Sequence, residues 1–256
     1  MCCFTVLTPL SLVGRLFAKR VHVSHTNVFA RMVRPGVQGL AYSMNLRTSQ
    51  EIAMVLPLPM APGGGEDAVS FVDLSAHPQM FSEFHYLFEP EVMRAKGGLS
   101  LARSQSTLVV HDIGSFIASY VPTRADFARL DPRFRMPEVL FEAVPRYADY
   151  GFAVFQLKPG TVTVHPMGLT FPTRDHRVFF PTVHVHDGRF HTRAKFDHAL
   201  YYQVPRITKI GDGQADGEVP SFQLPRASYA GLVDETRPLV RRILRGTLPN
   251  DDTWVS

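Results

Sequence analysis

The chain of 256 residues contains 45% hydrophobic and 20% charged residues, and its formal net charge is only +4. This apolar share is large enough to build a packed core, which argues against a disordered chain. Its arginines are scattered, apart from one group within residues 237–245, so nucleic-acid binding is not expected. No run approaches the ~18 apolar residues of a membrane-spanning helix, so no membrane span is expected either.

Both cysteines of the chain stand near its start, as Cys2 and Cys3. Adjacent cysteines do not readily reach disulfide geometry, so no intrachain disulfide framework is expected, and this usage fits a cytoplasmic location. The apolar opening segment is followed, not preceded, by its cations and contains Pro9, unlike a signal peptide. We therefore expect an N-terminal strand that is buried in a sheet.

Residues 1–73 are predicted to be rich in β-strands. Residues 21–33 mix β-branched and polar side chains, and residues 36–48 carry apolar side chains with a period of two. The apolar run 52–56 is typical of a strand buried on both faces, and Pro57 and Pro59 are expected to end its pairing.

The middle of the chain, residues 75–148, is predicted to be a partly helical insertion. Apolar residues recur with helical spacing over residues 80–88, and Ser75 is the expected N-cap of that helix. Two more short helices are expected, one capped by Thr123 and one that begins near Pro137.

Residues 149–205 are predicted to return to antiparallel strands, with hairpin turns at residues 158–160 and 186–188. Residues 206–256 are predicted to form a loop and then a C-terminal helix that ends at Gly246, where arginines in the last turn suit the helix dipole. The apolar stripe of that helix would consist of Leu232, Leu239, Val240, Ile243 and Leu244.

The fold class predicted from these elements is α+β and mainly β. We expect antiparallel sheets from the N- and C-terminal thirds, a partly helical middle and a C-terminal helix. Since the chain shows no internal repeat and no block of like charges, we expect a single domain over residues 1–256.

Three segments resemble a group of uncharacterised bacterial proteins. These proteins share a cysteine near the N-terminus and an apolar strand that ends in Leu-Pro-x-Pro, which corresponds here to residues 56–59. The similar segments are "VHVSHTNVFAR" (21–31), "AYSMNLRTSQEIAMVLPLPMAP" (41–62) and "VTVHPMGLTFPT" (162–173). The group has no established activity, so the resemblance implies none for this chain.

The densest chemical signal lies in residues 181–198, which contain four histidines. His184 and His186 are two residues apart, so both would project from one face of a strand, and His191 and His198 would follow the hairpin turn. Imidazoles that converge in this way bind zinc or copper. The predicted metal ligands are His165, His184, His186, His191, His198 and Cys3. The alternative is a solvated sheet face that binds nothing.

The cysteines support a second hypothesis. If Met1 were removed, Cys2 would be an N-terminal thiol with its own α-amino group as the base, as in N-terminal-nucleophile amidases. The two cysteines could instead bind a soft metal ion, or be small buried side chains of a strand.

Three functions therefore follow from the sequence. The first is a β-rich protein that binds a transition metal (zinc or copper) or another small molecule at the histidine-rich hairpin. The second is a cysteine-dependent hydrolase that uses Cys2. The third is a non-catalytic structural or interaction domain. The sequence leaves the oligomeric state open.

Overall fold

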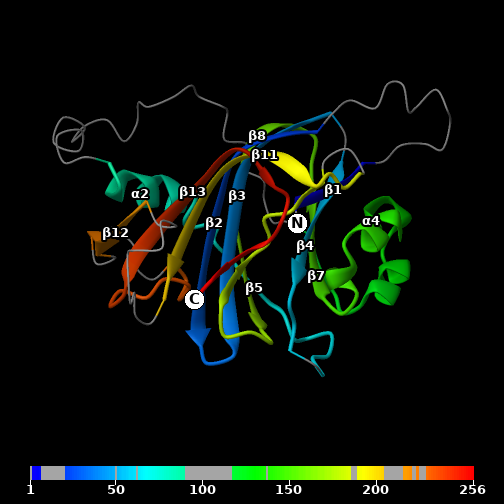
Figure 1. Cartoon of the computed structure of the whole chain (residues 1–256), viewed down its shortest axis with the longest axis horizontal. Helices are drawn as coiled ribbons and strands as arrows, with labels where there is room; N and C mark the ends of the chain where they lie inside the picture. The colour runs from blue at the N-terminus through cyan, green and yellow to red at the C-terminus, as the bar shows by residue number, and fades with distance from the viewer. Residues whose placement is uncertain are drawn as a thin grey trace.

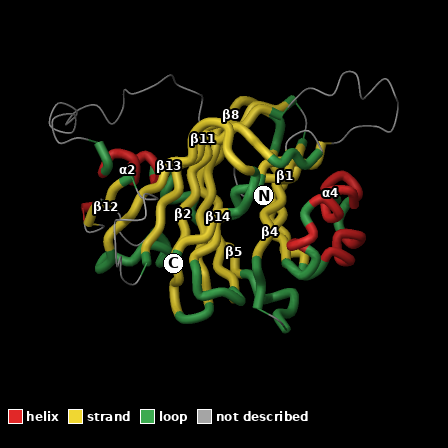
Figure 2. Tube along the Cα trace, in the orientation of Figure 1, coloured by secondary structure: helices red, strands yellow, loops and turns green. Residues whose placement is uncertain are grey.

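The structure is a computed structural model, and it describes residues 2–6, 21–49, 51–61, 63–89, 117–136, 138–185, 189–204, 216–220, 223–224 and 229–256. The described part consists mainly of strands, which form one seven-stranded sheet, one five-stranded sheet and one two-stranded sheet. The predicted β-rich fold class is therefore confirmed. Figures 1 and 2 show the two large sheets side by side, with short helices at both outer sides.

The seven-stranded sheet combines strands from both ends of the chain. Their order across the sheet is β12 (Gly217–Pro220), β13 (Pro238–Pro249), β11 (Arg193–Gln203), β2 (His22–Arg34), β3 (Val37–Thr48), β8 (Gly160–Pro172) and β5 (Ser70–Val72). All neighbours are antiparallel except β11 and β2, which run parallel. Gly36, with φ of 71°, makes the tight turn between β2 and β3, because a left-handed backbone favours glycine.

The five-stranded sheet has the N-terminal strand near one edge. Its order is β10 (His184–Val185), β1 (Cys2–Val6), β4 (Ile52–Leu58), β7 (Gly151–Leu157) and β6 (Ile117–Val121). Every residue of β4 is buried, so the predicted interior strand is confirmed. The strand continues past Pro57, which pairs with Phe152, and it ends before Pro59. A separate pair of strands, β9 (Val178–Phe180) and β14 (Thr253–Val255), forms the two-stranded sheet.

The core consists of three layers of apolar contacts. One cluster lies between the two large sheets and includes Tyr42 and Met54. A second covers the outer face of the five-stranded sheet with α4 (Glu138–Ala143) and the 3₁₀ segments η1 (Arg124–Arg129), η2 (Pro132–Phe134) and η3 (Pro145–Tyr147). A third packs α2 (Met80–Leu87) and the segment around Tyr229 on the outer face of the seven-stranded sheet. The three clusters thus cover both faces of each large sheet, and Figure 1 shows α2 and α4 at opposite outer sides.

The helices of the middle third are shorter than predicted. α2 begins at Met80, with Gln79 and not Ser75 at its N-cap position. The backbone N–H of Ser75 donates to Asp73 Oδ1 at 2.8 Å, which makes a turn in place of a helix start. Thr123 does precede η1, and its backbone N–H and hydroxyl both donate to Asp126 Oδ2.

The predicted C-terminal helix is wrong, because residues 238–249 form strand β13. The apolar spacing that suggested a helix also suits a strand that is covered on both faces. Leu239 packs in the cluster under α2, whereas Val240 and Leu244 face the core between the sheets. Gly246, the expected helix end, lies within the strand and pairs with Phe196.

In the described ranges, no helix is long and apolar enough to cross a membrane. The single-domain organisation and the cytoplasmic location stay predictions.

Candidate functional site

The predicted histidine hairpin does not form. His184 lies in β10, which pairs with β1 at the edge of the five-stranded sheet, whereas β11 belongs to the seven-stranded sheet. β11 instead pairs with β13 over residues 193–202 on one side and with β2 over residues 198–203 on the other. The turn residue His186 lies outside the described residues.

Two of the predicted ligands nevertheless meet across the two sheets. The Nε2 atoms of His184 and His198 are 2.9 Å apart, so one ring donates its N–H to the other. The ring centroids are 4.6 Å apart, with an angle of 32° between the ring planes. His198 is only 2% exposed, and His184 is half-buried. The contact arises because His198 points from β11 toward the core, where it reaches β10.

Phe196 forms the apolar side of this histidine pair. It lies two residues before His198 on β11, so both side chains project from the same face of the sheet. Its ring stacks on that of His184, with 4.5 Å between centroids, and lies 5.3 Å from that of His198. The two imidazoles therefore meet in a largely apolar setting.

Asn250 holds His184 in place. This side chain is 2% exposed, accepts a hydrogen bond from the backbone N–H of His184 at 2.7 Å, and donates to the carbonyl of His184 at 2.9 Å. It also donates to the carbonyl of His191 at 2.8 Å. The Asn250 side chain thus makes the two backbone hydrogen bonds to His184 that a neighbouring strand would otherwise make. The sequence analysis missed Asn250, because a single asparagine after Pro249 resembles a turn residue.

Asp197 brings negative charge to the other side of His198. Its Oδ2 accepts a hydrogen bond of 2.7 Å from the backbone N–H of His25, where φ is 50°. Its Oδ1 is 4.0 Å from Nδ1 of His198, and its side chain is 45% exposed. The carboxylate is therefore within ion-pair distance of this ring nitrogen but beyond hydrogen-bond distance.

The other predicted ligands are not brought to this pair. His165 lies on β8, which two strands separate from β11, and its Nδ1 contacts the carbonyl of Pro166 at 3.1 Å. His191 is exposed, and its backbone carbonyl accepts a hydrogen bond from the side chain of Asn250. Within the part of the chain that the structure describes, no group of three or more His, Cys, Asp and Glu residues could hold a metal ion.

The cysteines are described through their backbone alone. In the parallel pairing of β1 with β10, Cys2 lies opposite His184 and Cys3 opposite Val185. The register thus brings the predicted nucleophile next to one of the predicted ligands in the sheet. Catalysis by Cys2 and metal binding by Cys3 stay predictions.

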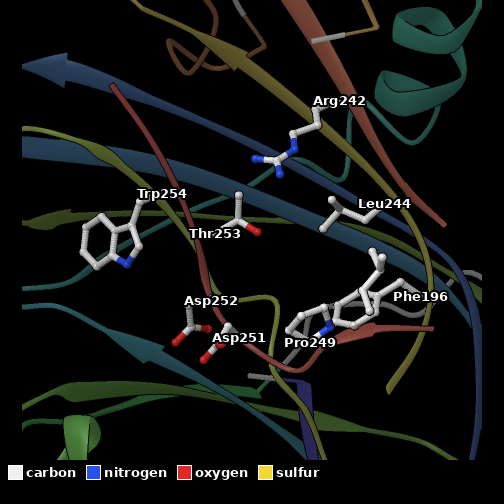
Figure 3. A pocket seen from close by; sticks show the side chains of 9 residues that line it. Phe196, Arg242, Leu244, Pro249, Asp251, Asp252, Thr253 and Trp254 are labelled. Atoms are coloured by element: carbon white, nitrogen blue, oxygen red, sulfur yellow. The ribbon is translucent and has the colours of Figure 1, made fainter. Parts of the chain in front are cut away.

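An open groove lies beside the histidine pair and shares Phe196 with it (Figure 3). Its volume is about 340 Å³. One wall carries Arg242, Leu244 and Leu248 of β13, and the other is formed by the C-terminal segment that crosses over this end of the sheet. The C-terminal wall consists of Pro249, Asp251, Asp252, Thr253 and Trp254.

A hydrogen-bonded network anchors the C-terminal wall. The buried Tyr147 donates its hydroxyl to Asp252 Oδ2 at 2.6 Å, and Arg146 forms an ion pair with Asp251 at 3.1 Å. Burial, together with the nearby Asp252 carboxylate, raises the pKa of Tyr147 well above its usual value. The tyrosine therefore stays neutral and can donate to Asp252 over the physiological pH range.

We expect Asn250→Ala to lower the free energy of unfolding by about 2–3 kcal/mol, because the backbone N–H and carbonyl of His184 would lose their partner in a half-buried place. Urea denaturation measures this loss. Asn45→Ala is the matched control, since Asn45 accepts a single hydrogen bond from Thr163, at 2.9 Å, and its loss should cost below about 1 kcal/mol. Equal losses in the two variants would show that Asn250 does not hold His184.

Comparison with known proteins identifies no family. No family model matches the chain, and no curated protein matches it. Among solved structures, baculovirus P35 is similar with a TM-score of 0.47 and 13% identity, over 92% of this chain and 97% of that chain. P35 in the caspase-8/P35 complex gives a TM-score of 0.45 and 11% identity, over 91% of this chain and 96% of that chain. These values are too low for a functional conclusion, and the resemblance to uncharacterised bacterial proteins stays a prediction.

Proposed function

We propose that this β-rich chain is a non-catalytic binding domain that takes up a segment of a partner protein in the open groove of Figure 3. The observation that carries the proposal is the lining of the groove. Leucine side chains of β13, Trp254, Arg242 and Asp251 converge there around about 340 Å³ of space. Tryptophan and arginine are the residue types that most often dominate the binding energy of protein interfaces.

The charges of the groove favour a polypeptide over a small apolar ligand. Arg242 stands on one wall, while the side chain of Asp251 on the other wall is 68% exposed. Small-molecule sites are usually enclosed and bury most of their ligand, whereas this groove is partly open to solvent. An open groove lined by both apolar side chains and charges of both signs is typical of a protein interface with a polar rim.

The C-terminal wall is rigid enough to present these side chains. Trp254 packs on Phe179 with 4.7 Å between ring centroids, and the guanidinium of Arg177 lies 4.7 Å from its ring. Together with the contacts of Asp252, these interactions fix the wall before a partner arrives. A preformed surface binds with a smaller loss of conformational entropy.

A photo-crosslinking amino acid in place of Leu248 tests the proposal in cells that produce the protein. We expect one discrete protein adduct, and we expect Arg242→Glu or Trp254→Ala in the same chain to reduce its yield about tenfold, as loss of a binding hot spot does. Purified caspase-8, which one P35 structure above contains, is a defined first bait.

The matched control carries the crosslinker at Val139, which is 58% exposed on α4, outside the groove. No discrete adduct at position 248, or equal adducts at both positions, would contradict the proposal. Adducts that persist in both groove variants would do so too.

A further inference from the structure

The small sheet of β9 and β14 has one edge that faces the groove. We infer that the partner segment binds there as an extended strand, which pairs with β14 and becomes the third strand of this sheet. The inference rests on the proposed function, because it states how the groove holds its partner. The occupant is therefore an extended polypeptide segment, which β14 recognises through its backbone.

The backbone of Trp254 points away from β9. Phe179 lies opposite Trp254, and its own backbone is bound on the far side by the buried side chain of Gln38. That side-chain amide donates to the carbonyl of Phe179 at 2.7 Å and accepts from its N–H at 2.9 Å. Phe179 and Trp254 therefore form the type of antiparallel pair that exchanges no hydrogen bonds, in which both residues direct their N–H and C=O outward.

The two edges of this small sheet differ. Gln38 closes the edge of β9 at Phe179. In the part of the chain that the structure describes, no strand pairs with the second edge of β14, and no hydrogen bond reaches the backbone of Trp254. An open strand edge readily pairs with a strand of another chain. The N–H and C=O of Trp254 are thus a donor and an acceptor for the backbone of a partner.

The groove occupies the place of the third strand. Its lining includes Thr253 and Trp254 of β14 and no described residue of β9, and its opposite wall is β13 (Figure 3). A strand beside β14 would therefore lie over β13, near Leu244 and Leu248. Because side chains alternate along a strand, every second residue of the partner would contact these leucines. We expect a partner segment in which apolar and polar side chains alternate.

Backbone methylation of the partner peptide tests this inference without a change in the protein. Mass spectrometry of the adduct at position 248 identifies the crosslinked peptide, which is then synthesised with a fluorescent label and titrated with the full chain. Two further peptides carry N-methyl groups on alternate amides, in one register or in the other. We expect one register to bind about tenfold more weakly and the other to bind like the unmodified peptide, because only every second N–H of a strand faces β14.

An ester bond tests the same contact from the side of the protein. When oxygen replaces the backbone N–H of Trp254, the indole is kept, and the peptide should bind about fivefold more weakly, as expected for the loss of one hydrogen bond. The matched control is the same replacement at Val139, which is 58% exposed and lies in the first turn of α4, where N–H groups have no partner within the helix. This control should leave binding unchanged.

The outcomes separate the added strand from the groove itself. Equal effects of the two methylation registers, or unchanged binding in the Trp254 ester, would overturn strand addition. If Trp254→Ala still reduced the adduct at position 248 in that case, the proposed function would stand. The absence of this adduct would overturn both.

Discussion

Met54→Asp is expected to lower the free energy of unfolding by about 3–5 kcal/mol, as an uncompensated buried charge does. Met54 is 0% exposed and lies in β4, where it pairs with Phe4 of β1 on one side and Phe155 of β7 on the other. Its side chain belongs to the cluster between the two large sheets. An aspartate there has neither water nor a cation to offset its charge, so the loss should be among the largest for a single substitution.

Thermal and urea denaturation of the full chain measure this effect. Met54→Leu is the matched control, because it keeps the volume and the apolar character and should cost below about 1.5 kcal/mol. If Met54→Asp melted like the wild type, β4 would not be the interior strand of the five-stranded sheet.

Phe84→Ala should also destabilise the protein by about 3–5 kcal/mol, since it leaves a large cavity in a packed aromatic cluster. Phe84 is 0% exposed and is the central ring of α2. Its centroid lies 5.3 to 5.7 Å from four other rings. These rings are Phe29, Phe81, Tyr201 and Tyr229. Because they come from four segments of the chain, the loss of Phe84 weakens the whole outer layer of the seven-stranded sheet.

The control for this substitution is Phe71→Ala. Phe71 lies on the edge strand β5, is 39% exposed and makes one edge-to-face contact, with Phe155 at 5.7 Å. It should cost clearly less than Phe84→Ala in the same urea titration, since a 39% share of its area stays exposed to water after folding whereas Phe84 is fully buried. If the two variants lost equal stability, α2 would be only loosely attached to the sheet.

The sequence alone determined the strands whose pattern is local. Residues 36–48 alternate and residues 52–56 are continuously apolar, and both segments form strands, β3 and β4. The continuous run marks a strand covered on both faces, whereas the alternation marks only the face of β3 toward the core between the sheets, because residues 38–44 are all buried. The apolar spacing at residues 80–88 likewise coincides with α2.

The tertiary structure decided which strands pair, and with that the nature of the C-terminal segment. The stripe around Leu239 and Leu244 fits a helix by its spacing, but residues 238–249 lie between β12 and β11 as a strand. Backbone hydrogen bonds to β11 along most of its length replace those within a helix. These hydrogen bonds can form only because β11, some forty residues earlier in the chain, lies next to β13. No local pattern in residues 238–249 reveals that neighbour.

The candidate site shows the same division. The sequence singled out His184 and His198, but it joined them through a hairpin that does not form. The structure instead brings them together from two different sheets, and it adds Asn250, from beyond β13, as the group that holds His184. The sequence states which residue types are present, whereas the distance between two side chains depends on the order of the strands in a sheet and on their register. Those are set by contacts between segments far apart in the chain, so only the folded structure could decide them.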